Sequence, residues 1–279
     1  MKKLGSILLA ALICSITVQS TQARHKGKPK KHHQATESIK TDKLSTYGAV
    51  NLKQAKIGEL EHKGALSLEA SEVQKAEIYG PAILKKTTVT KSLTVYGPLR
   101  VYEGALGDVD VKGACDLKKT KVAKLDVMGA LAIDETTVNG ATSIKGALKA
   151  DEGTFNKEVV IDGKLRADEC VFKGTLTLTP PRQIEFNSKK KRDRPVMVLE
   201  DCKAEEILIK GKPEEGKKFL VVLKDETKIK KITFESKEGL IAIYGRSTVD
   251  QVIGGEIKDS KKFQKPEKSK QSKKKSRKS

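Results

Sequence analysis

The sequence predicts an all-β fold: a single parallel β-helix, or β-solenoid, with three short strands in each coil of 16 or 17 residues and about 11 coils in all. Three observations predict it, namely a recurring glycine, apolar columns at fixed offsets from that glycine, and a column of small residues. The glycines that set the period are Gly48, Gly64, Gly80, Gly97, Gly113, Gly129, Gly146 and Gly163.

Each coil repeats the same inward positions, counted from its glycine. Positions plus two, plus four and plus nine are apolar. Position plus seven is small, and a further apolar pair follows. That last pair comes one residue later in the 17-residue coils. In the coil that begins at Gly113, the inward residues are Cys115, Leu117, Thr120, Val122, Leu125 and Val127.

Pairs of inward residues separated by single outward residues are typical of short strands with a period of two. Three such pairs in each period predict a triangular coil. Coils stacked about 4.8 Å apart pair each strand in parallel with its copies above and below. A β-sandwich would not keep one register through eight consecutive periods. The glycines are expected at one corner, where a positive φ or a close backbone approach excludes a side chain.

The pattern continues beyond Pro180 with less regular spacing. With Pro195 in the glycine position, one further coil ends at Gly211, a second covers 219–234, and a degenerate last coil covers 241–252. We therefore assign the solenoid to 37–257. The intervening segment 181–194 is either a distorted coil or a basic loop, and we expect the loop.

The N-terminus has the layout of a cleaved secretory signal. Lys2 and Lys3 precede an apolar run, and Thr21-Gln22-Ala23 supplies a cleavage site, so we assign 1–23 to a signal peptide. Ile13 precedes Cys14, where a lipoprotein signal needs a small residue. The sequence thus predicts export to the periplasm, the cell surface or the medium.

Most of the formal net charge of +20 lies at the two ends. The basic arm 24–36 and the Lys-rich tail 258–279 have almost no apolar residues, so we expect both to be disordered. The solenoid between them is nearly balanced. Polyanion-binding residues are predicted in the basic loop and in the tail: Lys189, Lys190, Lys191, Arg192, Arg194, Lys270, Lys273, Lys274, Lys275, Arg277 and Lys278.

An exported polycation is expected to bind anionic polymers or an anionic membrane surface. Nucleic acid would be bound only nonspecifically, because Phe263 is the one aromatic residue of the tails. The opposing interpretation is a tail that only keeps the protein soluble through charge repulsion.

The mature chain has three cysteines, and Cys115 occupies an apolar core position. Cys170 and Cys202 both occupy the small plus-seven column. A Cys170–Cys202 disulfide is feasible if their coils stack directly, because the Cα atoms would then lie about 5 Å apart. A coil formed by 181–194 would double that separation and exclude the bridge.

Acidic residues repeat at the corner after the first strand of several coils. Stacked carboxylates repel one another unless they are solvated or share a cation, and oxygen-rich clusters suit calcium. The sequence leaves three readings open: a solvated corner, a calcium site, or a dock for a basic tail. The ridge consists of Asp134, Glu135, Asp151, Glu152, Asp168 and Glu169, with Glu200 and Asp201 in a later coil.

No catalytic constellation is apparent, and we expect no enzyme activity and no cofactor apart from calcium. Three of the mature histidines lie in the basic arm, and His62 occupies an inward position. The chain has no nucleophile elbow, phosphate-binding loop or HExxH motif.

The short triangular coils with Gly-Ala-Leu openings at Gly64, Gly129 and Gly146 resemble bactofilins, the bacterial polymer-forming proteins. The likeness covers Gly48 to Leu178 and is architectural, so no site residue is transferred. It implies end-to-end polymerisation through the terminal coils. Those proteins usually act inside the cell, whereas this chain begins with an export signal.

The function expected is therefore that of an exported structural or interaction solenoid whose cationic tails attach it to an anionic envelope or host polymer. The alternative is a carbohydrate-binding adhesin or polysaccharide-active β-helix. Aromatic residues suited to stacking on sugars are few, chiefly Tyr79, Tyr96 and Tyr102.

Overall fold

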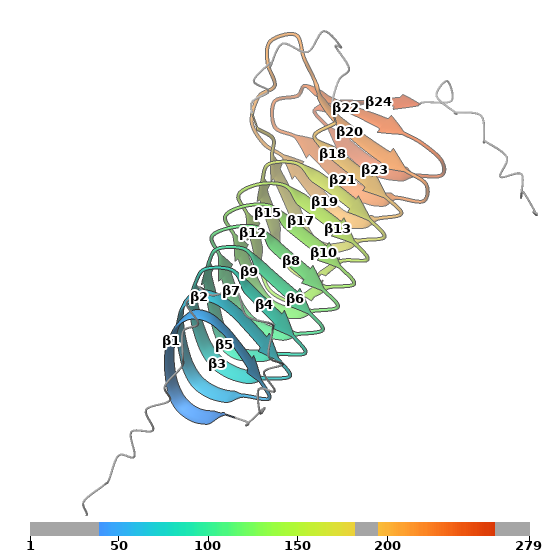
Figure 1. Ribbon diagram of the computed structural model, residues 1–279. Coiled ribbons are helices and arrows are strands. Elements are labelled where there is room, and N and C mark those ends of the chain that lie inside the picture. The colour runs from blue at the N-terminus through green and yellow to red at the C-terminus, as the bar shows by residue number, and fades with distance from the viewer. Residues whose placement is uncertain (1–38, 182–194, 260–279) are drawn as a thin grey trace, which may run out of the picture. The chain divides into compact units, whose positions relative to one another are not determined.

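The structure, a computed structural model, describes residues 39–181 and 195–259, which belong to one compact unit. These residues form 24 strands in one sheet that winds as a parallel β-solenoid (Figure 1). The predicted fold class is confirmed, with about twelve coils in place of 11. The array is longer because its first strand begins at Lys40, before the first glycine, and a strand follows the last predicted coil.

Each coil has three sides, which we name A, B and C in chain order after the glycine. Side A carries one strand from every coil. Its strands are the C-terminal parts of β1 (Lys40–Lys53) and β2 (Lys56–Glu69), then β4 (Ala82–Lys85), β6 (Leu99–Tyr102), β8 (Cys115–Lys118), β10 (Leu131–Asp134), β13 (Leu148–Asp151), β16 (Leu165–Asp168), β18 (Met197–Glu200), β20 (Phe219–Lys224), β22 (Gly239–Ile243) and β24 (Gly255–Asp259).

Sides B and C are joined by a gentle bend, so one strand often spans both. The spanning strands are β3 (Glu72–Tyr79), β5 (Thr88–Tyr96), β7 (Ala105–Val111), β9 (Lys121–Val127), β17 (Val171–Thr179), β19 (Lys203–Ile209), β21 (Lys228–Phe234) and β23 (Thr248–Ile253). In two coils the sides are separate, as β11 (Thr137–Val138) with β12 (Thr142–Ile144), and β14 (Thr154–Phe155) with β15 (Val159–Asp162).

Strands pair in register with their copies one coil away, as the columns predict. Leu131, for example, lies beside Cys115 and Leu148. The extra residue of a 17-residue coil is absorbed at the bend between sides B and C, where the register shifts between β3 and β5. A bulge at that point keeps every inward column aligned.

The inward columns form one continuous apolar core. Its members range from Leu52 in the first coil to Ile241 near the end, and most are fully buried. Complete burial of a side chain of this size stabilises the fold by about 2 kcal/mol. The core therefore runs along the solenoid, and each coil depends on its neighbours for cover.

The glycine corner joins side C to side A. At Gly64, Gly80, Gly97, Gly129 and Gly146 φ lies between +132° and +157°. A Cβ atom on any of these glycines would collide with the carbonyl group of the glycine one coil earlier. Both reasons proposed from the sequence for glycine at this corner are confirmed.

The corner between sides A and B turns with a different backbone conformation and without a conserved position for glycine in the repeat. Non-glycine residues adopt left-handed backbone there, with φ between +47° and +57°. Asp and Asn tolerate this conformation best among residues with a Cβ, and Asp201 and Asp225 fit that preference, whereas most of the other positions hold Lys or Glu. The residues are Gln54, Ala70, Lys86, Glu103, Lys119, Glu135, Glu152, Glu169, Asp201 and Asp225.

Candidate interaction surfaces

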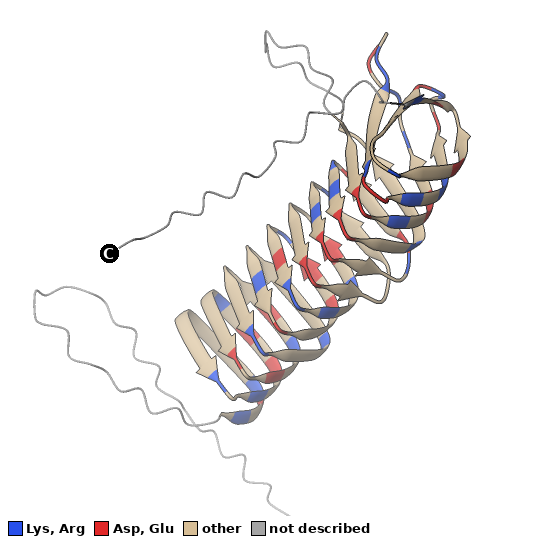
Figure 2. Ribbon diagram, turned by 90° about the vertical axis from the view of Figure 1, so that its right-hand side faces the viewer, with Lys and Arg blue, Asp and Glu red and all other residues tan. Residues whose placement is uncertain are grey.

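The acidic ridge is a real column at the corner between sides A and B. Asp134, Asp151, Asp168 and Glu200 occupy equivalent positions of four stacked coils. Lysines close both ends of the run: Lys118 Nζ lies 2.5 Å from Asp134, and Lys224 Nζ lies 3.0 Å from Glu200. Figure 2 shows that acidic and basic residues both occur along the length of the solenoid.

Burial and, after it, mutual repulsion raise the pKa values of two ridge carboxylates. Burial and the charges of Glu200 and Asp151 raise the pKa of Asp168. Burial and the charges of Glu135 and Glu169 raise the pKa of Glu152 in the same way. Within residues 39–181 and 195–259, however, no three His, Cys, Asp or Glu side chains come close enough together to hold a metal ion. The geometry thus lends the calcium reading no support.

The small plus-seven column is a hydrogen-bonding ladder inside the core. Thr87 Oγ1 donates to the carbonyl of Lys85 at 2.9 Å, and Thr136 Oγ1 donates to that of Asp134 at 3.0 Å. The same oxygens accept from the neighbouring coil, since the Thr120 amide donates to Thr136 Oγ1 at 3.4 Å. These bonds add to the backbone hydrogen bonds between coils at the left-handed corner, such as the one that the Lys119 amide donates to the carbonyl of Asp134 at 2.9 Å.

Cys170 and Cys202 occupy this ladder in adjacent coils. β16 pairs directly with β18, so the two coils stack with no strand between them. Each thiol donates to the carbonyl two residues earlier, Cys170 to Asp168 and Cys202 to Glu200, both at 3.1 Å. The thiols are reduced and fully buried. Hydrogen bonding to Cys202, together with burial, raises the pKa of Cys170.

We expect the Cys170–Cys202 bridge to form while the coils assemble and not afterwards, because folding removes both sulfur atoms from solvent. Refolding with oxidised glutathione should transfer two electrons and two protons from the thiols to glutathione, which leaves as two reduced molecules. Peptide mass mapping should then find the cross-linked peptide. Three free thiols after oxidative refolding, or equally fast bridging of the folded protein, would contradict this expectation.

His62 occupies an inward position on side C of the second coil, in register with Thr46 and Ile78. It is fully buried, and its Nδ1 is hydrogen-bonded to Thr46 Oγ1 at 2.8 Å. Its Nε2 has no hydrogen-bond partner among the described residues. Burial lowers the pKa of His62 from its ordinary value of 6.5, so the imidazole stays neutral at neutral pH.

We expect the first coils to lose stability as the pH falls below about 6.5. The unfolded state binds a proton on His62 there while the folded state does not, so protonation favours unfolding. The variant His62→Val reproduces Val95 and Val111 of the same column and should remove this dependence. Amide hydrogen exchange in β1 to β3 at pH 7.5 and 5.5 measures it, and an unchanged pH dependence in His62→Val would refute the assignment.

Tyr79 and Tyr96 stack on each other beside the glycine corner, with ring centroids 4.7 Å apart and planes 2° from parallel. Lys63 Nζ lies 5.8 Å from the ring centre of Tyr79, and Lys112 Nζ lies 4.5 Å from that of Tyr96. The two ring faces that the stack leaves are therefore next to lysines. This arrangement leaves little room for a sugar to stack on either ring.

The outer surface of side A contains a hollow that the sequence did not predict. It spans the coils from β6 to β18 and has a volume of about 530 Å³. Alanines form its floor, and longer cationic side chains stand around it. The sequence carried a partial signal, because of the five outward residues at plus three one is alanine and three are basic: Arg100, Asp116, Ala132, Lys149 and Arg166.

The two end coils each have one strand edge without a partner among the described residues. β1 pairs only with β2, whereas at the other end β23 pairs only with β21 and β24 only with β22. Apolar side chains near these edges are incompletely covered: Leu44 and Val50 are partly buried, and Ile257 is 49% exposed. Such edges are templates for pairing with another chain.

The predicted polyanion-binding residues Lys189 to Arg194 and Lys270 to Lys278 lie outside the described residues, as do the signal peptide and the basic arm. Within residues 39–181 and 195–259 no helix has the length and apolar character of a membrane span. No family model, curated protein or solved structure matches the chain. What is shown is the fold, an all-β parallel solenoid of about twelve coils.

Proposed function

We propose that this protein is an exported structural solenoid that attaches through polycationic tails to an anionic envelope or host polymer and assembles end to end. The observation that carries the proposal is the separation of charge between body and tails. Eleven Lys or Arg residues against two acidic residues follow residue 257, whereas the lysines of the solenoid are largely matched by acids.

The ion pairs of the solenoid link neighbouring coils. Lys53 pairs with Glu69 at 2.7 Å, and Lys56 pairs with Glu72 at 3.1 Å, each across one coil. Each surface ion pair of this kind stabilises the fold by only about 0.5 kcal/mol, but together these pairs balance much of the charge of the solenoid. Most of the excess of Lys and Arg over Asp and Glu is then concentrated in the tails, whose composition is typical of solvated segments.

End-to-end assembly is supported by the two open coils. A second molecule could add the side A part of β1 to the free edge of β24 and continue the parallel stack, burying Ile257 and Val50. The bactofilin-like architecture supports the same proposal. Twelve coils at about 4.8 Å would make each unit a rod of roughly 55 Å.

Electron microscopy of the purified mature protein tests assembly. We expect unbranched filaments one solenoid wide. The variant Ile257→Lys, which places a charge at the open end, should shorten or abolish them, whereas Lys203→Gln on side B should not. Monomers at every concentration would refute the proposal.

The alternative function is that of a carbohydrate-binding adhesin. A glycan array with the mature chain, and with a chain lacking residues 260–279, separates the two. Removing these residues leaves every strand of the described residues intact, because β24 ends at Asp259. We expect binding to anionic glycans that is lost with the tail and with high salt. Binding of neutral glycans that survives both changes would favour the adhesin.

A further inference from the structure

We propose that the outer surface of side A binds an extended acidic glycan, a chain of uronic acids lying along the solenoid axis. This proposal rests on the proposed function and narrows its anionic polymer to a carboxylated polysaccharide. Its basis is the hollow of about 530 Å³ over β6 to β18 and the charges around it.

Four exposed cations border this hollow: Arg100, Lys149, Lys164 and Arg166. None of them forms an ion pair with a carboxylate among the described residues. The one carboxylate in the lining is Asp116, which lies beside Arg100 in register. An uncompensated excess of positive charge along a groove favours an anionic ligand.

The cations are spaced along the axis. β6 and β13 are three coils apart, so the backbones of Arg100 and Lys149 are separated by about 14 Å, and Arg166 follows one coil later. A ligand that reaches all three must therefore be extended and carry repeated charges. Guanidinium groups pair with carboxylates in bidentate geometry, which suits uronic acids.

The floor between the cations is flat and apolar. Ala114, Ala130 and Ala147 line it at equivalent positions of three consecutive coils, and their short side chains leave this surface open. The C–H faces of a sugar chain can lie on such a floor while its carboxylates reach the flanking cations.

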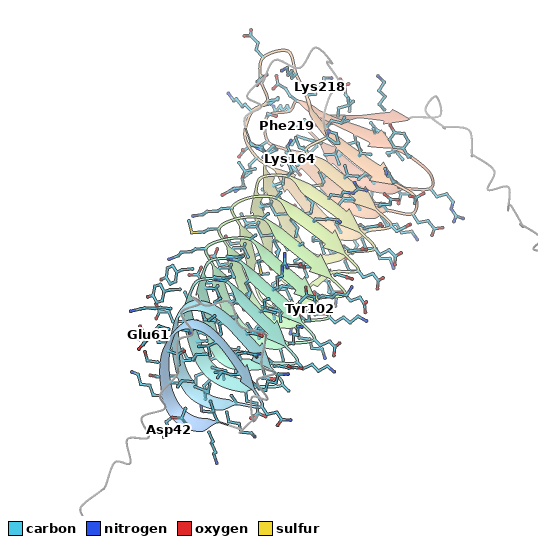
Figure 3. All side chains as sticks on the ribbon, in the orientation of Figure 1. Asp42, Glu61, Tyr102, Lys164, Lys218 and Phe219 are labelled. Atoms are coloured by element: carbon cyan, nitrogen blue, oxygen red, sulfur yellow. The ribbon has the colours of Figure 1, made fainter. Side chains whose placement is uncertain are left out.

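A second hollow of about 410 Å³ continues the groove and shares Arg100 with the first. It is lined by Tyr102, by Lys85 and Lys86, and by two carboxylates, Glu69 and Glu103, of which Glu103 pairs with Lys86 and Glu69 with Lys53. Figure 3 labels Tyr102 and Lys164, which belong to the two hollows. Unlike Tyr79 and Tyr96, Tyr102 is in no aromatic stack within the described residues, so its ring can cover a sugar at this end.

These features favour a glycan over a single-stranded nucleic acid. Nucleic-acid grooves place successive aromatic rings under successive bases, and the two hollows contain Tyr102 as their one aromatic residue. An acidic glycan carries a carboxylate on each sugar ring, and these rings have apolar C–H faces. It therefore fits the alanines and arginines of the groove better than a nucleic acid does.

The test is calorimetric titration of the full mature chain with hexagalacturonate. In all proteins compared, the Lys and Arg residues of 260–279 are replaced by Gln, so that the tail does not contribute. The groove variant is Arg100→Gln with Arg166→Gln. The matched control, Lys121→Gln with Lys203→Gln, removes two exposed charges from side B. A third variant, Ala132→Phe, obstructs the floor and keeps every charge.

We expect the groove variant to bind hexagalacturonate about tenfold more weakly than the control variant, and Ala132→Phe to weaken binding likewise. Maltohexaose, which is uncharged, and hexathymidylate, a phosphate polymer, should bind more weakly than hexagalacturonate. Equal affinities of groove and control variants, or hexathymidylate binding as tight as hexagalacturonate, would overturn the proposal. Tail-driven attachment is judged separately, with a long polymer and the native tail.

Discussion

Replacing Gly129 by alanine is expected to lower the free energy of unfolding by about 3 kcal/mol. Two costs add. The φ of +157° is one that residues with a Cβ rarely adopt, and the new methyl group would meet the carbonyl of Gly113 in the coil before. The carbonyl group of Gly113 cannot move away from the new methyl group, because it belongs to a corner on which the next coil is stacked.

The variant Gly216→Ala separates the two costs. Gly216 also has positive φ, +72°, but a Cβ there would have no atom within 4 Å. We expect a loss of about 1 kcal/mol from backbone strain alone. Urea unfolding followed by circular dichroism compares both variants with the parent. Equal losses for Gly129→Ala and Gly216→Ala would show that close stacking of the glycine corner is not what excludes a side chain.

The second large effect is expected from Phe155→Val, a loss of about 3 kcal/mol. Phe155 is fully buried and stacks on Phe172 with ring centroids 5.0 Å apart. Both phenylalanines occur in coils whose plus-four residue is alanine, at Ala150 and Ala167. Other coils combine a larger plus-four residue with valine, as in Leu84 with Val89. The side chains at plus four and plus nine of one coil thus fill the same space in the core.

A double-mutant cycle tests this shared volume. Ala150→Leu alone should destabilise by about 2 kcal/mol through overpacking against Phe155. The double variant recreates the Leu and Val combination of Leu117 with Val122, and should recover about half of the loss of Phe155→Val. Recovery is incomplete because Gly153 replaces the threonine of those coils. Additive losses in urea unfolding would show that the two positions do not share space.

The repeat determines most of the fold because each column has one physical requirement. Apolar plus-two and plus-four residues, the glycine corner and the extra residue of longer coils were all predicted from spacing, and the pairing register confirms them. The first coil was missed as a full coil, since no glycine precedes Lys40 to mark its start. Its inward residues, such as Leu44, follow the columns without that marker.

Functional surfaces were harder to predict. The plus-seven column was interpreted only as small, yet its Ser, Thr and Cys members donate to the corner carbonyl, as Thr136 does to Asp134. The alanine and glycines of the same column are small but have no donor, so size alone did not reveal the hydrogen bonds. The hollow on side A depends on outward side chains such as Ala132 and Arg166, which carry no periodic apolar signal.

The measurement that tests the central claim most directly is the salt dependence of binding to a long anionic polymer such as polygalacturonate. The mature chain is compared with a chain of equal length in which Gln replaces the Lys and Arg residues of 260–279. If the tail attaches the protein, the logarithm of the affinity falls linearly with the logarithm of the salt concentration for the native chain, with a much smaller slope and weaker binding for the variant. Equal affinities and equal slopes would contradict attachment through the tail.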